Sequence, residues 1–199
     1  DLVVGGALAP RPTRLPDADP LLGSRGDDLL RGSADDDLLR GGAGQDSADY
    51  STSSAGVLAD LAAGTAVGDG HDRLNGIEGV YGSPFADTLL GDAGANVLSG
   101  GGGDDTLDGR DGSDWLAGND GADVFAIEPG ASGDVDRIAD FTPGVDHVDL
   151  AAFAFDGWED VVARITVVDG AATLDLRSAG GGQVAFDHVA TLHAEDFLF

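Results

Sequence analysis

Residues 82–126 read GSPFADTLL GDAGANVLS GGGGDDTLD GRDGSDWLA GNDGADVFA, five consecutive nonapeptides without an insertion. Each fits the frame G-x-x-G-x-D-x-Φ-x, in which Φ is a large apolar residue, and the only departure at position four is Phe85. Position six is an acid or an amide: Asp87, Asn96, Asp105, Asp114 and Asp123. Position eight is apolar: Leu89, Leu98, Leu107, Leu116 and Phe125.

This frame predicts a turn followed by a short strand. Positions one to six are too rich in Gly and Asp for a helix or strand, because glycine allows positive φ and Asp closes turns through its carboxylate. Positions seven to nine place one buried apolar residue between two outward-facing ones, which is a minimal strand. Two units complete one coil, so units i and i+2 stack and their strands pair in parallel. The sequence therefore predicts an all-β fold, a parallel β-roll.

An earlier block repeats the pattern. It reads GSRGDDLLR from Gly23, GSADDDLLR from Gly32 and GGAGQDSAD from Gly41, with Asp28, Asp37 and Asp46 at position six. Leu30 and Leu39 occupy position eight, but Ala48 fails there, so the third unit ends the block. We expect residues 21–49 and 82–126 to be two repeat blocks.

Stacked turns bring one carboxylate per layer into line with the next, beside glycine-loop carbonyls that have no other partner. Such an arrangement requires cations. An all-oxygen site of flexible geometry suits Ca²⁺ better than Mg²⁺, which prefers a strict octahedron with retained waters. The sequence thus predicts several bound calcium ions.

These repeats resemble the RTX (repeats-in-toxin) family of bacterial exoproteins. The resemblance implies a right-handed roll in which position-six acids ligate Ca²⁺ by their side chains and glycines at positions one, two and four do so by their carbonyls. In the first block the implied ligands are Gly23, Gly26, Asp28, Gly32, Asp37, Gly41, Gly42, Gly44 and Asp46. In the second block they are Gly82, Asp87, Gly91, Gly94, Asn96, Gly100, Gly101, Gly103, Asp105, Gly109, Gly112, Asp114, Gly118, Gly121 and Asp123. Asn96 is neutral, so the sites that it shares should be weaker.

Three other segments complete the predicted organisation. Residues 1–20 contain four prolines and read as a linker. Residues 50–81 interrupt the frame, and we expect them to form further coils with shorter turns, so that both blocks stack in one roll. Residues 127–199 are expected to form a β-rich cap, with strands at 165–168, 172–176 and 183–186 and a short helix within 156–162, because an open sheet end would aggregate.

The start of the cap, DVDRIADFTPGVDHVDL from Asp134, is similar to the segment that follows RTX repeats in serralysin-type proteases and alginate-epimerase modules. By that resemblance Asp136 and Asp140 hold one more cation. The chain ends in an acid and three apolar residues, a pattern typical of substrates of type I secretion; the alternative is a last strand that packs into the cap.

Composition supports metal-coupled folding. The formal net charge is −27, from 33 Asp and 4 Glu against 10 Arg and no Lys. Without cations such a chain should repel itself and expand. There is no Cys to form disulfides, no apolar run long enough to span a bilayer, and no basic cluster for nucleic acid. The absence of Met indicates a piece of a longer protein.

No catalytic motif is present. The four histidines never form H-E-x-x-H, and neither G-x-S-x-G nor a Cys nucleophile occurs. We therefore expect a non-enzymatic, secreted, calcium-binding module that folds on Ca²⁺ outside the cell and supports type I secretion of a larger exoprotein. The alternatives are a carbohydrate-binding or accessory module of a polysaccharide-processing enzyme, and the C-terminal part of a protease or lipase.

Overall fold

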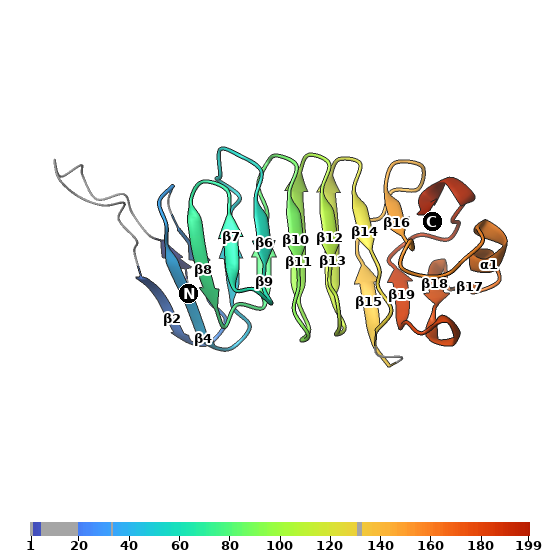
Figure 1. The fold of residues 1–199 in the computed structure, drawn as a ribbon, viewed down its shortest axis with the longest axis horizontal. Coiled ribbons are helices and arrows are strands. Elements are labelled where there is room, and N and C mark those ends of the chain that lie inside the picture. The colour runs from blue at the N-terminus through green and yellow to red at the C-terminus, as the bar shows by residue number, and fades with distance from the viewer. Residues whose placement is uncertain (1, 5–19, 33, 131–132) are drawn as a thin grey trace.

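The chain forms two long β-sheets that enclose one core. The computed structural model describes residues 2–4, 20–32, 34–130 and 133–199. Figure 1 shows the strands as layers stacked along the long axis, with the C-terminal elements at one end. No helix among the described residues is both long and apolar enough to cross a membrane.

The strands of each sheet follow one another along the axis of the roll. In this spatial order, sheet A contains β1 (Leu2–Val4), β3 (Leu29–Arg31), β5 (Ser47–Asp49), β9 (Gly79–Tyr81), β11 (Val97–Gly102), β13 (Trp115–Asp120), β15 (Val135–Ile138), β19 (Gln183–Phe186), β18 (Ala171–Asp175) and β17 (Ile165–Val168). Sheet B contains β2 (Pro20–Arg25), β4 (Leu38–Ala43), β8 (His71–Asn75), β7 (Thr65–Val67), β6 (Leu58–Asp60), β10 (Thr88–Leu90), β12 (Thr106–Asp108), β14 (Val124–Ala126), β16 (His147–Asp149) and β20 (Phe197–Leu198). The helical elements are α1 (Trp158–Val162) and the 3₁₀ turns Arg177–Ala179 and Ala194–Asp196.

Strand register confirms the predicted coil. Successive repeat units alternate between the sheets, and each strand pairs in parallel with the strand two units later. Leu89 lies beside Leu107, and Leu107 beside Phe125, in sheet B. Leu98 lies beside Leu116 in sheet A. The fold is therefore the predicted all-β parallel roll with a C-terminal cap.

Position eight supplies the core. Its side chains are completely buried in both blocks, and even Ala48 is buried, although it is too small to fill the slot. The buried members are Leu30, Leu39, Leu89, Leu98, Leu107, Leu116 and Phe125. Burying each such side chain contributes about 1.5–3 kcal/mol, so one residue per nonapeptide stabilises each layer.

The connecting segment differs from the predicted coils. In sheet B, β7 runs antiparallel to both β6 and β8, while β8 pairs with β4 and β6 pairs with β10 in parallel. In sheet A, β9 lies directly between β5 and β11. The chain reverses after β6 through a turn in which Gly64 has φ +67°. Both blocks thus join one roll, but through an antiparallel insertion.

The cap closes the roll with aromatic side chains. Strands β17, β18 and β19 pair antiparallel close to their predicted positions, and α1 falls within the predicted helix. Phe141 packs between Phe125 and Phe186, with ring centroids 6.0 and 5.3 Å away. The C-terminal residues form β20 beside β16.

The predicted linker is described only at its two ends. Leu2–Val4 form β1, which pairs with β3, so these residues add a strand to the roll and are not extended linker. Pro20 begins β2. Most of the predicted linker, including Asp19, lies outside the described residues.

Candidate metal centre

Acidic and amide side chains line up in two columns, one at the start of the strands of each sheet. Column A, along sheet A, comprises Asp28, Asp46, Glu78, Asn96, Asp114 and Asp136. Column B, along sheet B, comprises Asp37, Asp72, Asp87, Asp105, Asp123 and Asp146. Asp136 and Asp72 are the second residues of β15 and β8, and every other member immediately precedes its strand. All of them except Glu78 and Asp136 are at most 5% exposed.

One carboxylate oxygen in each layer holds the layer before it. In column B the backbone N–H of Asp87 donates to Oδ1 of Asp105 at 2.7 Å, and that of Asp105 to Oδ1 of Asp123 at 2.9 Å. The N–H of Asp123 donates to Oδ1 of Asp146 at 3.0 Å. In column A the N–H of Asn96 donates to Oδ1 of Asp114 at 2.8 Å. The columns are therefore side chain-to-backbone ladders that hold the layers in register.

The second oxygen points back at the glycine that opens the same unit. A Cβ added to Gly100, Gly109 or Gly118 would lie only 2.0–2.1 Å from Oδ2 of the acid five residues later. The same clash, at 2.3–2.5 Å, would occur at Gly23, Gly32, Gly41, Gly82 and Gly91. Position one is glycine because the position-six side chain fills the space that a Cβ would need.

Among the described residues, four of these second oxygens are buried and have no hydrogen-bond donor. They are Oδ2 of Asp46, Asp105, Asp114 and Asp123. A buried carboxylate oxygen without a partner is costly, by roughly 1–3 kcal/mol or more for a charged group. These atoms are what a cation site requires, so the residues present fit calcium at these layers.

The pKa values of the column carboxylates also favour a cation site. Burial, reinforced by neighbouring carboxylates, raises the pKa of Asp105 and Asp114 to about 7. The same causes raise the pKa of Asp123 and Asp136 to about 6. Carboxylates gathered in low-dielectric surroundings disfavour their own ionisation, and a nearby cation would reverse this.

The glycines at positions two and four keep the stacked turns in close contact. Gly42 and Gly101, at position two, have φ of +116° and +108°. A Cβ at either would meet a carbonyl oxygen of the preceding layer at 2.4 Å. The predicted position-four glycines, Gly26, Gly44, Gly94, Gly103, Gly112 and Gly121, lie in the same stacked turns. The predicted glycines thus lie beside the columns, either in the turns or at the ends of strands that run into them; those within β2, β4, β11 and β13 are Gly23, Gly41, Gly42, Gly100, Gly101 and Gly118.

Asp87 and Asn96 differ, because protein donors occupy both carboxylate oxygens of Asp87 and the single amide oxygen of Asn96. Asp87 accepts from the N–H and hydroxyl of Ser83, and from the N–H of Val57 at 2.6 Å. The Asn96 side chain accepts from the N–H of Asp92 at 2.8 Å and donates to the carbonyl of Glu78. These contacts suit a structural role for Asp87 and Asn96 better than coordination of a cation.

Sequence reasoning missed three column members, because their segments lack the nonapeptide frame. Asp72 accepts from the N–H of Asp37 and from the hydroxyl of Tyr50, at 2.8 and 2.9 Å. Glu78 accepts from the N–H of Asp46, and Asp146 from those of Asp123 and Thr142. Each is followed two residues later by a buried apolar residue, so an acid-x-apolar triplet was the available signal.

The predicted pair Asp136 and Asp140 lies at opposite ends of β15. Asp136 accepts from the N–H of Asp114 at 3.2 Å, within column A. Asp140 accepts from the N–H groups of Gly118 and Asn119 at 3.1 and 2.8 Å. The two carboxylates therefore accept hydrogen bonds from different segments of the chain. A cation bound between them remains a prediction.

Among the described residues, no three His, Cys, Asp or Glu side chains converge on one point. Coordination in the columns would therefore depend on carboxylates together with the backbone carbonyls of the stacked turns, which is compatible with Ca²⁺.

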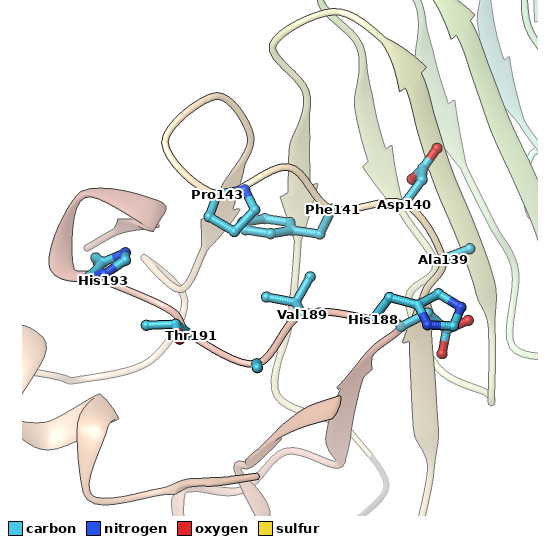
Figure 2. Close-up of a pocket in the computed structure, with 10 residues that line it drawn as sticks. Ala139, Asp140, Phe141, Pro143, His188, Val189, Thr191 and His193 are labelled. Carbon is cyan, nitrogen blue, oxygen red and sulfur yellow. The ribbon is translucent and has the colours of Figure 1, made fainter. Parts of the chain in front are cut away.

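A depression in the cap lies outside the columns. Its volume is about 530 Å³, and its lining includes Asp140, Phe141, His188 and His193. Figure 2 shows Asp140 and His188 on one side of it and Pro143 and His193 on the other. The two histidines do not face each other across a shared ligand position, so this depression adds no metal centre.

Comparison with known proteins identifies the repeats. A family model described as the RTX calcium-binding nonapeptide repeat matches in four copies, over residues 16–48, 81–116 and 104–126. These spans include Asp46, Asp105, Asp114 and Asp123, whose Oδ2 atoms have no donor among the described residues. A comparison with curated protein sequences gives no significant match.

The solved structures that are similar to the chain include an epimerase subunit and a lipase. The AlgE6R3 subunit of the Azotobacter vinelandii mannuronan C5-epimerase is 30% identical over 58% of this chain and 78% of that one, with a TM-score of 0.26. The extracellular lipase LipA of Serratia marcescens is 19% identical, with a TM-score of 0.38; the match covers 93% of this chain and 39% of the lipase. The two in-frame repeat blocks of this chain belong to the RTX calcium-binding nonapeptide-repeat family.

Proposed function

We propose that this chain is a calcium-binding module that folds when Ca²⁺ loads its columns outside the cell and thereby supports type I secretion and folding of a larger exoprotein. The observation that carries the proposal is a set of four buried Oδ2 atoms to which no group of the described residues donates a hydrogen bond: those of Asp46, Asp105, Asp114 and Asp123. In this proposal the segment itself is not catalytic.

The predicted ligands have two roles in this proposal. Acids with a free oxygen hold calcium together with carbonyls of the glycine turns, within residues 21–49 and 82–126. Residues 50–81 join the two blocks, and 127–199 close the roll. Asp87 and Asn96 keep the layers in register through hydrogen bonds. Calcium supplies positive charge that neutralises neighbouring carboxylates.

The net negative charge of the chain explains why it would fold only after export. The chain has a formal net charge of −27, and a ligand bound only by the folded state stabilises it by RT ln(1 + [L]/Kd). Where free calcium is scarce, repulsion keeps the chain expanded and able to be threaded through a channel. Where calcium is abundant, the columns fill and the layers stack.

The test is a Ca²⁺ titration of this chain followed by far-UV circular dichroism, with Mg²⁺ as control. We expect a cooperative coil-to-β transition with Ca²⁺ alone. Asp114→Asn keeps an oxygen for the Asn96 N–H but removes the charge, so it should raise the calcium midpoint several-fold. Asp160→Asn, at an exposed position of helix α1, is the matched control and should leave it unchanged. At pH 7, a folded spectrum in excess chelator, or equal midpoints for the two variants, would overturn the proposal.

A further inference from the structure

Strand β17 (Ile165–Val168) is the last strand of sheet A, at the capped end of the molecule (Figure 1). It pairs with β18 on one side, and no described strand pairs with it on the other. An open edge offers backbone donors and acceptors to another extended chain, and proteins commonly protect such edges with proline, lysine or a very short strand. The sequence of β17, ITVV, has neither residue, whereas β20, the last strand of sheet B, is only two residues long.

The hydrogen bonds between β17 and β18 show which backbone groups of β17 face the open edge. The carbonyl of Arg164, next to the first residue of β17, accepts the N–H of Asp175 at 3.0 Å. Bonded and non-bonded positions alternate along an antiparallel pair, so every second residue from Arg164 onward bonds to β18. The N–H and C=O groups of Ile165 and Val167 therefore point away from β18, toward the open edge.

The side chains of β17 are incompletely covered. Val167 lies opposite Ala172 of β18, which is completely buried, so both project toward the core side of sheet A. Val167 is nevertheless 49% exposed, and Val168, on the other face, is 68% exposed. The core thus ends before this strand is covered, because within the described part of the chain sheet A has no strand beyond it. A strand added at this edge would cover Val167 and continue the sheet.

The charge around this edge differs from that of the whole chain. A formal net charge of −27 opposes association of two copies. Residues 161–174 contain one base, Arg164, and one acid, Asp169, so this stretch is neutral. The Arg164 guanidinium donates to the carbonyl of Asp160 at 3.1 Å and to the hydroxyl of Ser178, and both partners are neutral groups. Asp169 is exposed in the turn that joins β17 to β18. One charge of each sign is thus available at the edge.

We propose that β17 pairs with β17 of a second copy of this chain, antiparallel and related to it by a two-fold axis perpendicular to the sheet. With the axis at Thr166, Ile165 of each copy lies opposite Val167 of the other. The outward N–H and C=O groups of both residues then bond across the interface. The two Thr166 side chains lie opposite each other, and such threonine pairs stabilise antiparallel strands. Sheet A becomes continuous through both copies.

The same register matches the charges. Arg164 of one copy lies opposite Val168 of the other, one residue from Asp169 of that copy. By symmetry the reciprocal pair forms as well, so each base meets an acid and the neutral stretch between them adds no repulsion. A two-fold contact of this kind closes after two copies, unlike a head-to-tail contact between opposite ends of the roll. This self-complementarity favours a second copy over an unrelated extended segment.

Sedimentation velocity of the full chain at saturating calcium, from low to high micromolar concentration, tests the interface. We expect a reversible dimer with a dissociation constant in the micromolar range, because one pair of short strands buries less surface than a standard protein interface. Val167→Pro should weaken dimerisation about tenfold or more, because an edge strand tolerates proline where the N–H faces away from the sheet, and only the outward donor is lost.

Val167→Lys should weaken dimerisation to a similar degree, because it places a charge opposite Ile165 of the other copy. Val67→Lys is the matched control. Val67 is 41% exposed, but it lies on β7, which is paired on both sides, so this variant should change the dissociation constant less than twofold.

Hydrogen exchange locates the contact. The amides of Ile165 and Val167 should gain protection as the concentration of the calcium-loaded chain rises, and circular dichroism of each variant in calcium separates loss of the contact from loss of the fold. A folded chain that stays monomeric at high micromolar concentration would overturn the proposal. Growth beyond two copies, or equal weakening by Val67→Lys and Val167→Lys, would also contradict it. None of these outcomes would affect the proposed calcium-driven folding, which a single chain undergoes.

Discussion

At the scale of single residues, the two oxygens of a position-six aspartate have different surroundings. Oδ1 accepts the N–H of the layer before it, whereas Oδ2 lies against the opening glycine and, in Asp105, Asp114 and Asp123, meets no donor. The same residue therefore aligns the strands and offers an oxygen to a cation. The resemblance to the RTX family predicted that this residue binds a cation, and the structure adds that it aligns the strands.

The raised pKa values of Asp105, Asp114, Asp123 and Asp136 predict how the calcium-free chain responds to acid. Their folded-state pKa values, about 6–7, exceed the ordinary value of 3.8, so the folded state binds more protons than the unfolded state between these limits. Stability without calcium should be greatest below about pH 4 and should fall as pH rises through about 6–7.

Denaturant unfolding in calcium-free buffers at pH 5, 6 and 7 measures this. We expect β-structure to be retained at pH 5 and lost at pH 7, and saturating calcium to remove the difference. Stability that rises from pH 5 to pH 7 without metal would show that the carboxylates are not buried together.

At the scale of elements, the nonapeptide period was sufficient to predict the strands of both blocks, because each unit carries its own turn and core residue. It failed for residues 50–81. Without an opening glycine and a position-six acid in frame, the sequence does not fix where a coil begins, and the apolar residues Leu74, Ile77 and Val80 fit several topologies. The reversal at Gly64 depends on pairing between strands that lie far apart in sequence.

The hydrogen bonds within column B predict that its layers differ in metal binding. Asp105→Asn should remove at least one bound calcium ion, because it removes charge from an unpartnered oxygen. Asp87→Asn should leave the number of bound ions unchanged, since Ser83 and Val57 already occupy both of its oxygens. Equilibrium dialysis with radioactive calcium counts the ions directly. The same stoichiometry for both variants would contradict the assignment.

At the scale of the whole molecule, the cap and the roll share one core. Aromatic residues and alternating strands in the sequence predicted a cap, and the structure places it over the last repeat. A depression of about 510 Å³ lined by Arg40 and Arg73 could not be predicted, because it lies where the insertion meets two strands more than 30 residues apart in the chain.

The shared core predicts that the cap stabilises the calcium-loaded repeats. Phe141 is 4% exposed and packs against Phe125 of the last repeat and Phe186 of the cap. Phe141→Ala should destabilise the loaded protein by about 3–5 kcal/mol, as expected for a truncated buried aromatic residue. Phe85→Ala is the control, because this side chain is 47% exposed and its truncation should cost little stability.

Urea unfolding at saturating calcium, followed by far-UV circular dichroism, should show one transition shifted to lower urea for Phe141→Ala. If the repeats instead unfold at their original urea concentration while only the near-UV signal of the cap is lost, the two parts are independent units, and closure of the roll by Phe141 contributes nothing to its stability.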